Sequence, residues 1–212
     1  MKAIGIFGGT FDPVHIGHLR PALELKTSLG LAEVRMVPCR IPPHRNSPVV
    51  KAEQRVLMLQ AALEGVGELS LDLREMEREG PSYMADTLTS LRCEMPEQPL
   101  CLIIGMDALL GLPSWHRWTE LIELAHLVVM ARPGYELPNE GVVAELVAAH
   151  RLSSADELHG RPAGGIWFSE VSQLDVSATA LRALIAKGRT IRYLTPDAVC
   201  EVIEREGLYQ IN

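Results

Sequence analysis

The sequence predicts an α/β fold built on a doubly wound, mostly parallel, Rossmann-like sheet. Short apolar runs alternate along the chain with longer stretches of helical periodicity, as expected when helices cover both faces of a parallel sheet. The 212 residues suffice for one sizeable core, and 47% of them are hydrophobic against 22% charged, as in an ordinary globular protein. We therefore expect a single domain over residues 1–212, with a helical C-terminal portion at 170–212.

Six apolar runs are predicted to form the strands, and five periodic stretches between them the helices. The predicted strands are 3–7, 34–38, 69–73, 100–104, 127–131 and 166–168. The predicted helices are 16–29, 51–64, 83–93, 118–125 and 142–150. A further helix is expected after Ser177, running through Arg182 to Lys187. The stretch 153–165 is polar and contains glycine, so we expect a flexible loop there.

Charge and composition argue against several classes of function. The formal net charge is −7 and no basic cluster occurs, which disfavours nucleic-acid binding, because such binding depends on neutralising phosphates. No apolar run reaches the roughly 18 residues of a membrane span, and no signal peptide is expected before the first strand. The four cysteines show no Cys-x-x-Cys spacing, so reduced thiols in a cytoplasmic protein are expected.

The segment GGTFDPVHIGHL at 8–19 lies where the first strand should pass into the first helix. Glycines let such a turn approach an anion closely, and the first amides of the following helix point toward that anion. His15 and His18 are three positions apart, on nearly the same helical face, and can donate hydrogen bonds to a phosphoryl group as its charge grows. This segment therefore predicts a nucleotide-transfer site.

Other interpretations of the histidine pair remain open. The two imidazoles could be half of a zinc site, for which Cys39 and His44 are the nearest further ligands, or they could be surface or capping residues. The chain has no Gly-x-x-x-x-Gly-Lys-Ser/Thr loop and no Gly-x-Gly-x-x-Gly turn, so neither a P-loop nor a hydride-transferring dinucleotide site is expected. Phosphate chemistry would here use imidazole where a P-loop uses lysine.

Two later segments add cationic and hydroxyl groups. The loop 38–45 gathers two arginines and a histidine between prolines. Arginine forks suit phosphate oxygens, and a solvated proline loop is the simpler alternative. Ser177 precedes a helix, so it can be an ordinary N-cap. The same helix start could instead receive phosphate, with Arg182 one turn further on.

The fourth predicted strand ends near two further candidate groups. Gly105 and Asp107 follow it, at a place where an acidic side chain often accepts a hydrogen bond from a ribose hydroxyl. Trp115 and Trp118 come next, in a chain that is only 5% aromatic. A flat ring could stack on one of these indoles, and core packing is the alternative role for both.

Taken together, these segments resemble the nicotinate mononucleotide adenylyltransferases, bacterial enzymes that make deamido-NAD from ATP and nicotinate mononucleotide. The matching segments are GGTFDPVHIGH at 8–18, PPHR at 42–45, GPSY at 80–83, DTL at 86–88, IGMD at 104–107, LPSW at 112–115, RPG at 132–134 and VSATALR at 176–182. The His-x-Gly-His element alone marks only a superfamily, which also includes phosphopantetheine adenylyltransferases and class I aminoacyl-tRNA synthetases. Those synthetases are much larger and carry a Lys-Met-Ser-Lys-Ser loop, which this chain lacks.

The resemblance implies a Rossmann-like nucleotidyltransferase fold and assigns a role to each matching residue. His15, His18 and Arg182 form the implied catalytic set, and Asp107 would contact ribose. The implied ATP site comprises Gly8, Gly9, Thr10, Phe11, His15, His18, Gly105, Asp107, Ser177, Thr179 and Arg182. The implied nicotinate mononucleotide site comprises His44, Arg45, Tyr83, Met84, Trp115, His116 and Arg132.

On the mononucleotide side, the resemblance places His44 and Arg45 at the phosphate and Trp115 against the pyridine ring. Main-chain amides near positions 84 and 116 would meet the nicotinate carboxylate. The family often has threonine where this chain has Met84, so selectivity for the acid over the amide rests more on main-chain donors. Many members also have Ser-Ser-Thr where this chain has Ser-Ala-Thr at 177–179, and the flanking hydroxyls remain.

The implied reaction is in-line attack of the mononucleotide phosphate on ATP without a covalent intermediate. Mg²⁺ would be carried by the ATP phosphates and water, with no metal site made of protein side chains. The expected partners are ATP and nicotinate mononucleotide, with no nucleic acid and no membrane, and the oligomeric state stays open, a homo-oligomer included. Transfer to phosphopantetheine or to nicotinamide mononucleotide is the nearest alternative, and a non-catalytic nucleotide sensor is another.

Overall fold

The centre of the molecule is a six-stranded sheet in the order β3-β2-β1-β4-β5-β6. The computed structural model describes residues 1–43, 48–131 and 137–210. All five strand pairs of this sheet are parallel, which confirms the predicted doubly wound α/β fold. The strands are β1 (Ile4–Gly9), β2 (Val34–Pro38), β3 (Leu69–Leu71), β4 (Leu100–Gly105), β5 (His126–Ala131) and β6 (Ile166–Glu170).

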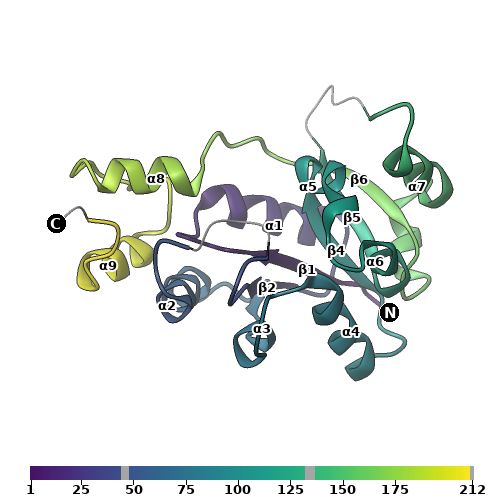
Figure 1. Cartoon of the computed structure of the whole chain (residues 1–212), viewed down its shortest axis with the longest axis horizontal. Helices are drawn as coiled ribbons and strands as arrows, with labels where there is room; N and C mark the ends of the chain where they lie inside the picture. Colours follow the sequence, from purple (N-terminus) through teal and green to yellow (C-terminus); the bar gives the residue numbers. More distant parts are fainter. Residues whose placement is uncertain (44–47, 132–136, 211–212) are drawn as a thin grey trace.

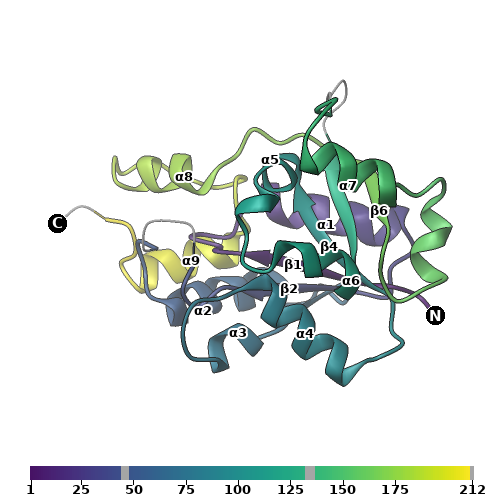
Figure 2. The same cartoon turned by 45° about the vertical axis from the view of Figure 1, so that its right-hand side comes forward.

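A helix precedes or follows each strand, and the last two α-helices of the chain lie near each other. The α-helices are α1 (Ile16–Ser28), α2 (Ala52–Leu63), α3 (Arg74–Glu77), α4 (Met84–Glu94), α5 (Met106–Leu110), α6 (Leu121–Leu124), α7 (Val142–His150), α8 (Ala178–Ile185) and α9 (Asp197–Arg205). The 3-10 helices are η1 (Leu112–Ser114), η2 (Trp118–Glu120) and η3 (Ala155–His159). Figures 1 and 2 show α8 and α9 at the end of the molecule with the C-terminus, and the N-terminus at the opposite end.

Side-chain alternation along the strands produces two hydrophobic cores, one on each face of the sheet. In β4, Cys101 and Ile103 join a core that also contains buried residues of α1, α2 and α9. Leu102 and Ile104 point to the opposite core, which is covered by α4, α5, α6 and α7. Both faces of a parallel sheet are thus buried, which explains why the strands are nearly continuous apolar runs in the sequence.

The strand order reverses between β1 and β4, and this reversal positions the candidate site. From β1 the chain winds outward through β2 and β3, then returns to β4 on the other side of β1 and continues to β5 and β6. Ligands of open α/β sheets bind at the carboxyl ends of the strands, at such a switch point. The glycine turn after β1 and Gly105 at the end of β4 both lie there.

The segment predicted as a flexible loop is an ordered connection, so that prediction was wrong. Residues Ala155–His159 form η3, which Ser154 caps by accepting a hydrogen bond from Asp156 N. Leu158 is fully buried. His159 accepts a hydrogen bond from Ala3 N (3.0 Å) through Nδ1 and contacts Leu29 O (2.9 Å) through Nε2. The polar composition of this segment therefore supports contacts with the start of β1 and the end of α1.

The remaining boundaries differ by small amounts, with one predicted helix divided in two. The predicted helix 118–125 is η2 followed by α6, and the residue before it, Arg117, has a left-handed backbone (φ 53°). The predicted strand 69–73 ends earlier, at Leu71. In the part of the chain that the structure describes, none of the helices has both the length and the apolar character needed to cross a membrane.

Candidate active site

The glycine turn that ends β1 is tightly enclosed by two side chains. A Cβ atom at Gly9 would come within 2.7 Å of the Phe11 ring, which is buried and whose backbone is left-handed (φ 50°). A Cβ at Gly8 would overlap the terminal methyl group of Met84. Only glycine fits at these two positions, because neighbouring side chains already occupy the places that a Cβ atom would take.

The two histidines lie against each other at the start of α1. Their rings are stacked, with centroids 3.8 Å apart and planes at 29°. His15 is the N-cap residue, and its backbone N–H donates to Nδ1 of His18 at 3.3 Å. Because Nδ1 of His18 accepts this bond, the proton of a neutral His18 ring is on Nε2. His18 therefore presents Nε2–H as a donor.

Burial determines the charge of the His15 side chain. His15 is only 5% exposed, and burial lowers the pKa of its side chain from the ordinary 6.5 to about 4, because a charged ring loses more hydration than a neutral one. His15 is thus a neutral group at physiological pH. It can position a phosphate by hydrogen bonding and does not add a full positive charge.

The low pKa of His15 predicts that acid weakens the fold. In the unfolded chain the ring takes up a proton near pH 6.5, and in the folded protein only near pH 4. Stability from this group is complete above about pH 6.5 and is lost as the pH falls toward 4, by at most about 1.4 kcal/mol per pH unit. Urea unfolding between pH 7.5 and 4.5 measures this, and His15→Asn should show a shallower pH dependence. Parallel curves for both proteins would contradict the assignment.

Arg182 of α8 lies on the other side of the glycine turn. Its guanidinium donates to Asp12 O at 2.6 Å and to Thr179 Oγ1 at 3.1 Å. The start of α8 is close to that of α1, because a Cβ at Gly17 would be 3.3 Å from Val176 O. Arg182 is thus bonded to the loop that leads into α1, the helix that begins directly after His15.

The hydroxyl groups at the start of α8 are already engaged in the helix. Ser177 is the N-cap, and its Oγ accepts a hydrogen bond from Ala180 N at 3.2 Å. Ordinary capping is therefore one role of this residue. Both Ser177 and Thr179 are exposed, so their hydroxyl oxygens remain accessible from solvent.

Asp107 lies in the first turn of α5, directly after β4. It is exposed, and its carboxylate folds back over Gly105, since a Cβ there would be 2.7 Å from Oδ1 of Asp107. β4 is the strand next to β1. The carboxylate thus lies at the same edge of the sheet as the glycine turn, where the predicted ribose contact requires it.

Aromatic rings gather where α4 faces the segment after α5. Tyr83 and His116 are stacked, with centroids 4.2 Å apart. Trp115 and Trp118 are both half-buried and pack against the core under α4. Core packing, the alternative considered for the indoles, is therefore observed for both of them.

A salt bridge joins the two segments that carry these rings. The guanidinium of Arg117 contacts Asp86 of α4 at 3.0 Å and also pairs with Glu120. The segment that contains His116 is thereby joined to the start of α4, where Met84 lies.

The sequence did not single out Arg55, a fully buried cation beneath the site. Its Nη1 donates to Thr10 O at 2.7 Å and its Nη2 to Arg40 O at 3.1 Å. It therefore joins the loops that follow β1 and β2. The available signal was its spacing, because Arg55 shares the buried face of α2 with Met58, Leu59 and Ala62, where an arginine needs specific partners.

Comparison with known proteins identifies the family. Residues 6–184 match the family described as cytidylyltransferase-like. A protein of Aeromonas hydrophila named "Probable nicotinate-nucleotide adenylyltransferase" is 52% identical over 98% of this chain and 97% of its own length. One of the same name from Methylococcus capsulatus is 49% identical over 97% of this chain and 99% of its own. The chain belongs to the nicotinate-nucleotide adenylyltransferase family.

The fold of this family member is also similar to a more distant solved structure. The Plasmodium falciparum nicotinic acid mononucleotide adenylyltransferase complexed with NaAD superimposes with a TM-score of 0.72 at 17% identity, over 99% of this chain and 98% of that one. The same Plasmodium enzyme complexed with APC gives a TM-score of 0.70. These two similarities concern the fold.

Several site residues predicted from the family resemblance lie outside the described part of the chain. They are His44, Arg45 and Arg132. The loop that leads to the first two begins beside the glycine turn, since Cys39 N donates to Gly9 O at 2.9 Å. The described residues contain no group of three or more histidine, cysteine or acidic side chains placed to hold a metal ion.

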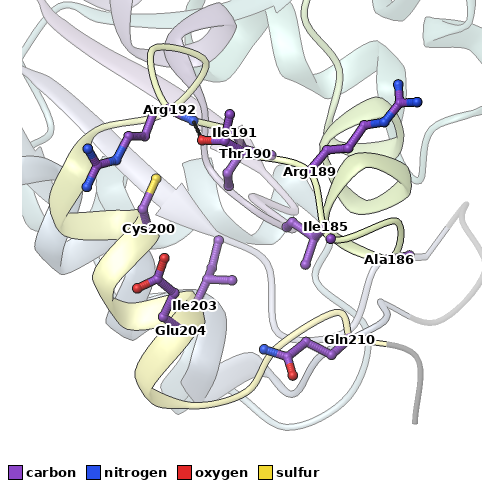
Figure 3. Close-up of a pocket in the computed structure, with 11 residues that line it drawn as sticks. Ile185, Ala186, Arg189, Thr190, Ile191, Arg192, Cys200, Ile203, Glu204 and Gln210 are labelled. Atoms are coloured by element: carbon purple, nitrogen blue, oxygen red, sulfur yellow. Dashed lines mark hydrogen bonds between the residues drawn. The ribbon is translucent and has the colours of Figure 1, made fainter.

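The protein also has a cavity of about 530 Å³, which lies away from this site. It lies between the C-terminal end of α8 and α9 and is lined by none of the predicted site residues. Figure 3 shows Arg189, Arg192 and Glu204 at its rim, with Cys200 and Ile203 in its wall.

Proposed function

We propose that this chain transfers the adenylyl group of ATP to nicotinate mononucleotide, giving deamido-NAD and pyrophosphate. The observation that carries this proposal is the stacked His15–His18 pair at the start of α1, next to a loop whose Asp12 O accepts a hydrogen bond from Arg182. The chain is also about half identical, over nearly its whole length, to proteins named for this activity. The reaction is a step of NAD biosynthesis.

The reaction is an in-line displacement at the α-phosphorus of ATP. A phosphate oxygen of the mononucleotide forms a bond to this phosphorus, and the bond from phosphorus to the oxygen that bridges to the β-phosphate breaks, so that pyrophosphate leaves with its charge. No covalent bond to the protein forms. Catalysis of this kind depends on positioning and on stabilising the charge of the leaving group.

The ATP side of the site is supplied by the switch point of the sheet. The start of α1 offers backbone amides for the phosphates, and Gly8 and Gly9 end the strand that leads to it. His18 and Arg182 donate to the triphosphate from opposite sides, and Asp107 contacts the ribose. Phe11, whose ring edge packs on the His18 ring with centroids 5.1 Å apart, holds the imidazole in place.

The mononucleotide side is supplied by α4 and the segment after α5, together with His44, Arg45 and Arg132. Trp115 stacks on the pyridine ring, and amides near Met84 and His116 bind the carboxylate. Tyr83 and His116, which stack on each other at 4.2 Å, form one end of this pocket. The salt bridge between Arg117 and Asp86 supports the arrangement because it joins both walls.

Mg²⁺ enters with ATP, held by phosphate oxygens and water. This ion prefers octahedral oxygen ligands and keeps several waters when it binds with a nucleotide. The acidic groups near the glycine turn fit this view, since both oxygens of the Asp12 carboxylate already accept hydrogen bonds from Tyr209 and Val49. The ion would neutralise charge on the triphosphate while His18 and Arg182 orient it.

The deciding experiment is a panel of acceptors with ATP and Mg²⁺, assayed by pyrophosphate release. We expect turnover with nicotinate mononucleotide, weaker turnover with nicotinamide mononucleotide and none with phosphopantetheine. The nicotinamide arm measures how far main-chain donors replace the hydroxyl that Met84 lacks. Fastest turnover with another acceptor would reassign the substrate, and ATP binding without pyrophosphate release from any of them would indicate a nucleotide sensor.

A further inference from the structure

The C-terminal segment of the chain returns to the glycine turn through one tyrosine. Tyr209 follows α9 and is 9% exposed, and its hydroxyl donates to Oδ1 of Asp12 at 2.8 Å. The two residues are 197 positions apart. The match to the cytidylyltransferase-like family ends at residue 184, so this contact comes from outside the matched segment.

Asp12 connects the tyrosine to the catalytic arginine. Its main-chain oxygen accepts a hydrogen bond from Arg182 at 2.6 Å, while Oδ2 of its carboxylate accepts one from Val49 N at 2.8 Å. The same Oδ2 is 3.7 Å from the guanidinium, which is too long for a hydrogen bond. Asp12 is only 5% exposed, and its carboxylate thus forms an ion pair with Arg182 that includes no hydrogen bond.

The backbone conformations of Tyr209 and Phe11 indicate that surrounding contacts hold both residues in place. The backbone of Tyr209 is in the left-handed region (φ 63°), and so is that of Phe11 (φ 50°), the residue before Asp12. Residues other than glycine rarely adopt this conformation, and it persists only where surrounding contacts hold it. Burial, and after it the charge of Asp12, raise the pKa of Tyr209, so the hydroxyl keeps its proton and remains a donor.

We propose that Tyr209 is a positioning residue for adenylyl transfer, acting through Asp12 on Arg182. This inference rests on the proposed function. The hydroxyl of Tyr209 and the amide of Val49 each bind one carboxylate oxygen, so Asp12 cannot rotate into a close ion pair with Arg182. The guanidinium therefore keeps donors for the triphosphate. Without the hydroxyl, Asp12 competes with ATP for Arg182.

The test is Tyr209→Phe, which removes the hydroxyl, together with its weak 3.9 Å contact to the sulfur of Met58, and keeps the ring in the hydrophobic core. We expect kcat/KM for ATP to fall about 10- to 100-fold, the size typical of a displaced catalytic group, and KM for nicotinate mononucleotide to change little. Tyr193→Phe is the matched control, because Tyr193 also has a left-handed backbone conformation but is 88% exposed. This control should behave like the unmodified protein.

A double-mutant cycle separates positioning from a general loss of structure. In an Arg182→Lys background, Tyr209→Phe should change kcat/KM for ATP by less than about twofold, because residues that act through one another are not additive. Equal effects in both backgrounds, or full activity of Tyr209→Phe, would overturn the proposal. If Tyr209→Phe unfolds, Asp12→Asn is measured in its place: because it removes the carboxylate that would compete for Arg182, ATP should bind as tightly as to the unmodified protein, and weaker binding would overturn the proposal.

Direct ATP binding distinguishes failure of this inference from failure of the proposed function. Calorimetric titration with ATP and Mg²⁺ needs no acceptor. If the unmodified protein transfers to no acceptor, the proposed function fails, yet weaker ATP binding by Tyr209→Phe than by Tyr193→Phe would still support the role of Tyr209. Equal ATP affinity in the two variants would refute that role.

Discussion

Replacing His18 with alanine is expected to lower kcat by about 10²- to 10³-fold while the affinity for nicotinate mononucleotide changes little. In the proposed reaction the imidazole donates through Nε2 to a phosphoryl group whose charge increases in the transition state, and loss of one such donor typically costs this much. Steady-state kinetics with both substrates varied measure the change. The separation of kcat from the mononucleotide KM is the informative part, because a ground-state contact would raise KM instead.

Two further substitutions examine which ring nitrogen matters. Glutamine can place an amide N–H near the position of Nε2, whereas the shorter asparagine reaches only the region of Nδ1. Since Nδ1 of His18 accepts the His15 N–H, we expect His18→Gln to retain more activity than His18→Asn. His150→Ala, at the end of α7, controls for the loss of a histidine elsewhere. Full activity of His18→Ala would exclude the assigned role.

Replacing Arg55 with alanine is expected to lower the free energy of unfolding by about 2–5 kcal/mol, from a cavity and two carbonyl groups left without a donor. The side chain is fully buried and bonds to Thr10 O and Arg40 O. Domains of this kind have only about 5–15 kcal/mol of stability, so the variant should unfold at clearly lower urea concentration. Urea titration followed by circular dichroism measures the difference.

Matched variants separate volume from hydrogen bonding at this position. Arg55→Met fills much of the space but donates no hydrogen bond, so it should recover part of the stability and still place the glycine turn poorly. Arg20→Ala removes an exposed arginine that pairs with Glu24, and exposed substitutions usually change stability by less than about 0.5 kcal/mol. Equal stability of Arg55→Ala and Arg20→Ala would show that the buried contacts contribute nothing.

Local patterns were sufficient to predict the secondary structure that frames the site. The strand at 34–38 and the helix at 142–150 are observed with the predicted bounds. Both are stretches whose pattern alone indicates the element: a continuous apolar run for a strand buried on two faces, and a periodic run for a helix. The segment 153–165 was predicted wrongly because its ordering depends on contacts of His159 with distant residues.

The parallel α/β architecture, the glycine turn and the pair of histidines could all be predicted, since each depends on residues within a few positions of one another. How Arg182 is held, and which groups support it, depends on residues far apart in the chain. Asp12 and Tyr209 are 197 positions apart, and Arg55 and Thr10 are 45 apart. Local periodicity contains no information about such pairs, because they meet only when the sheet and its covering helices have assembled.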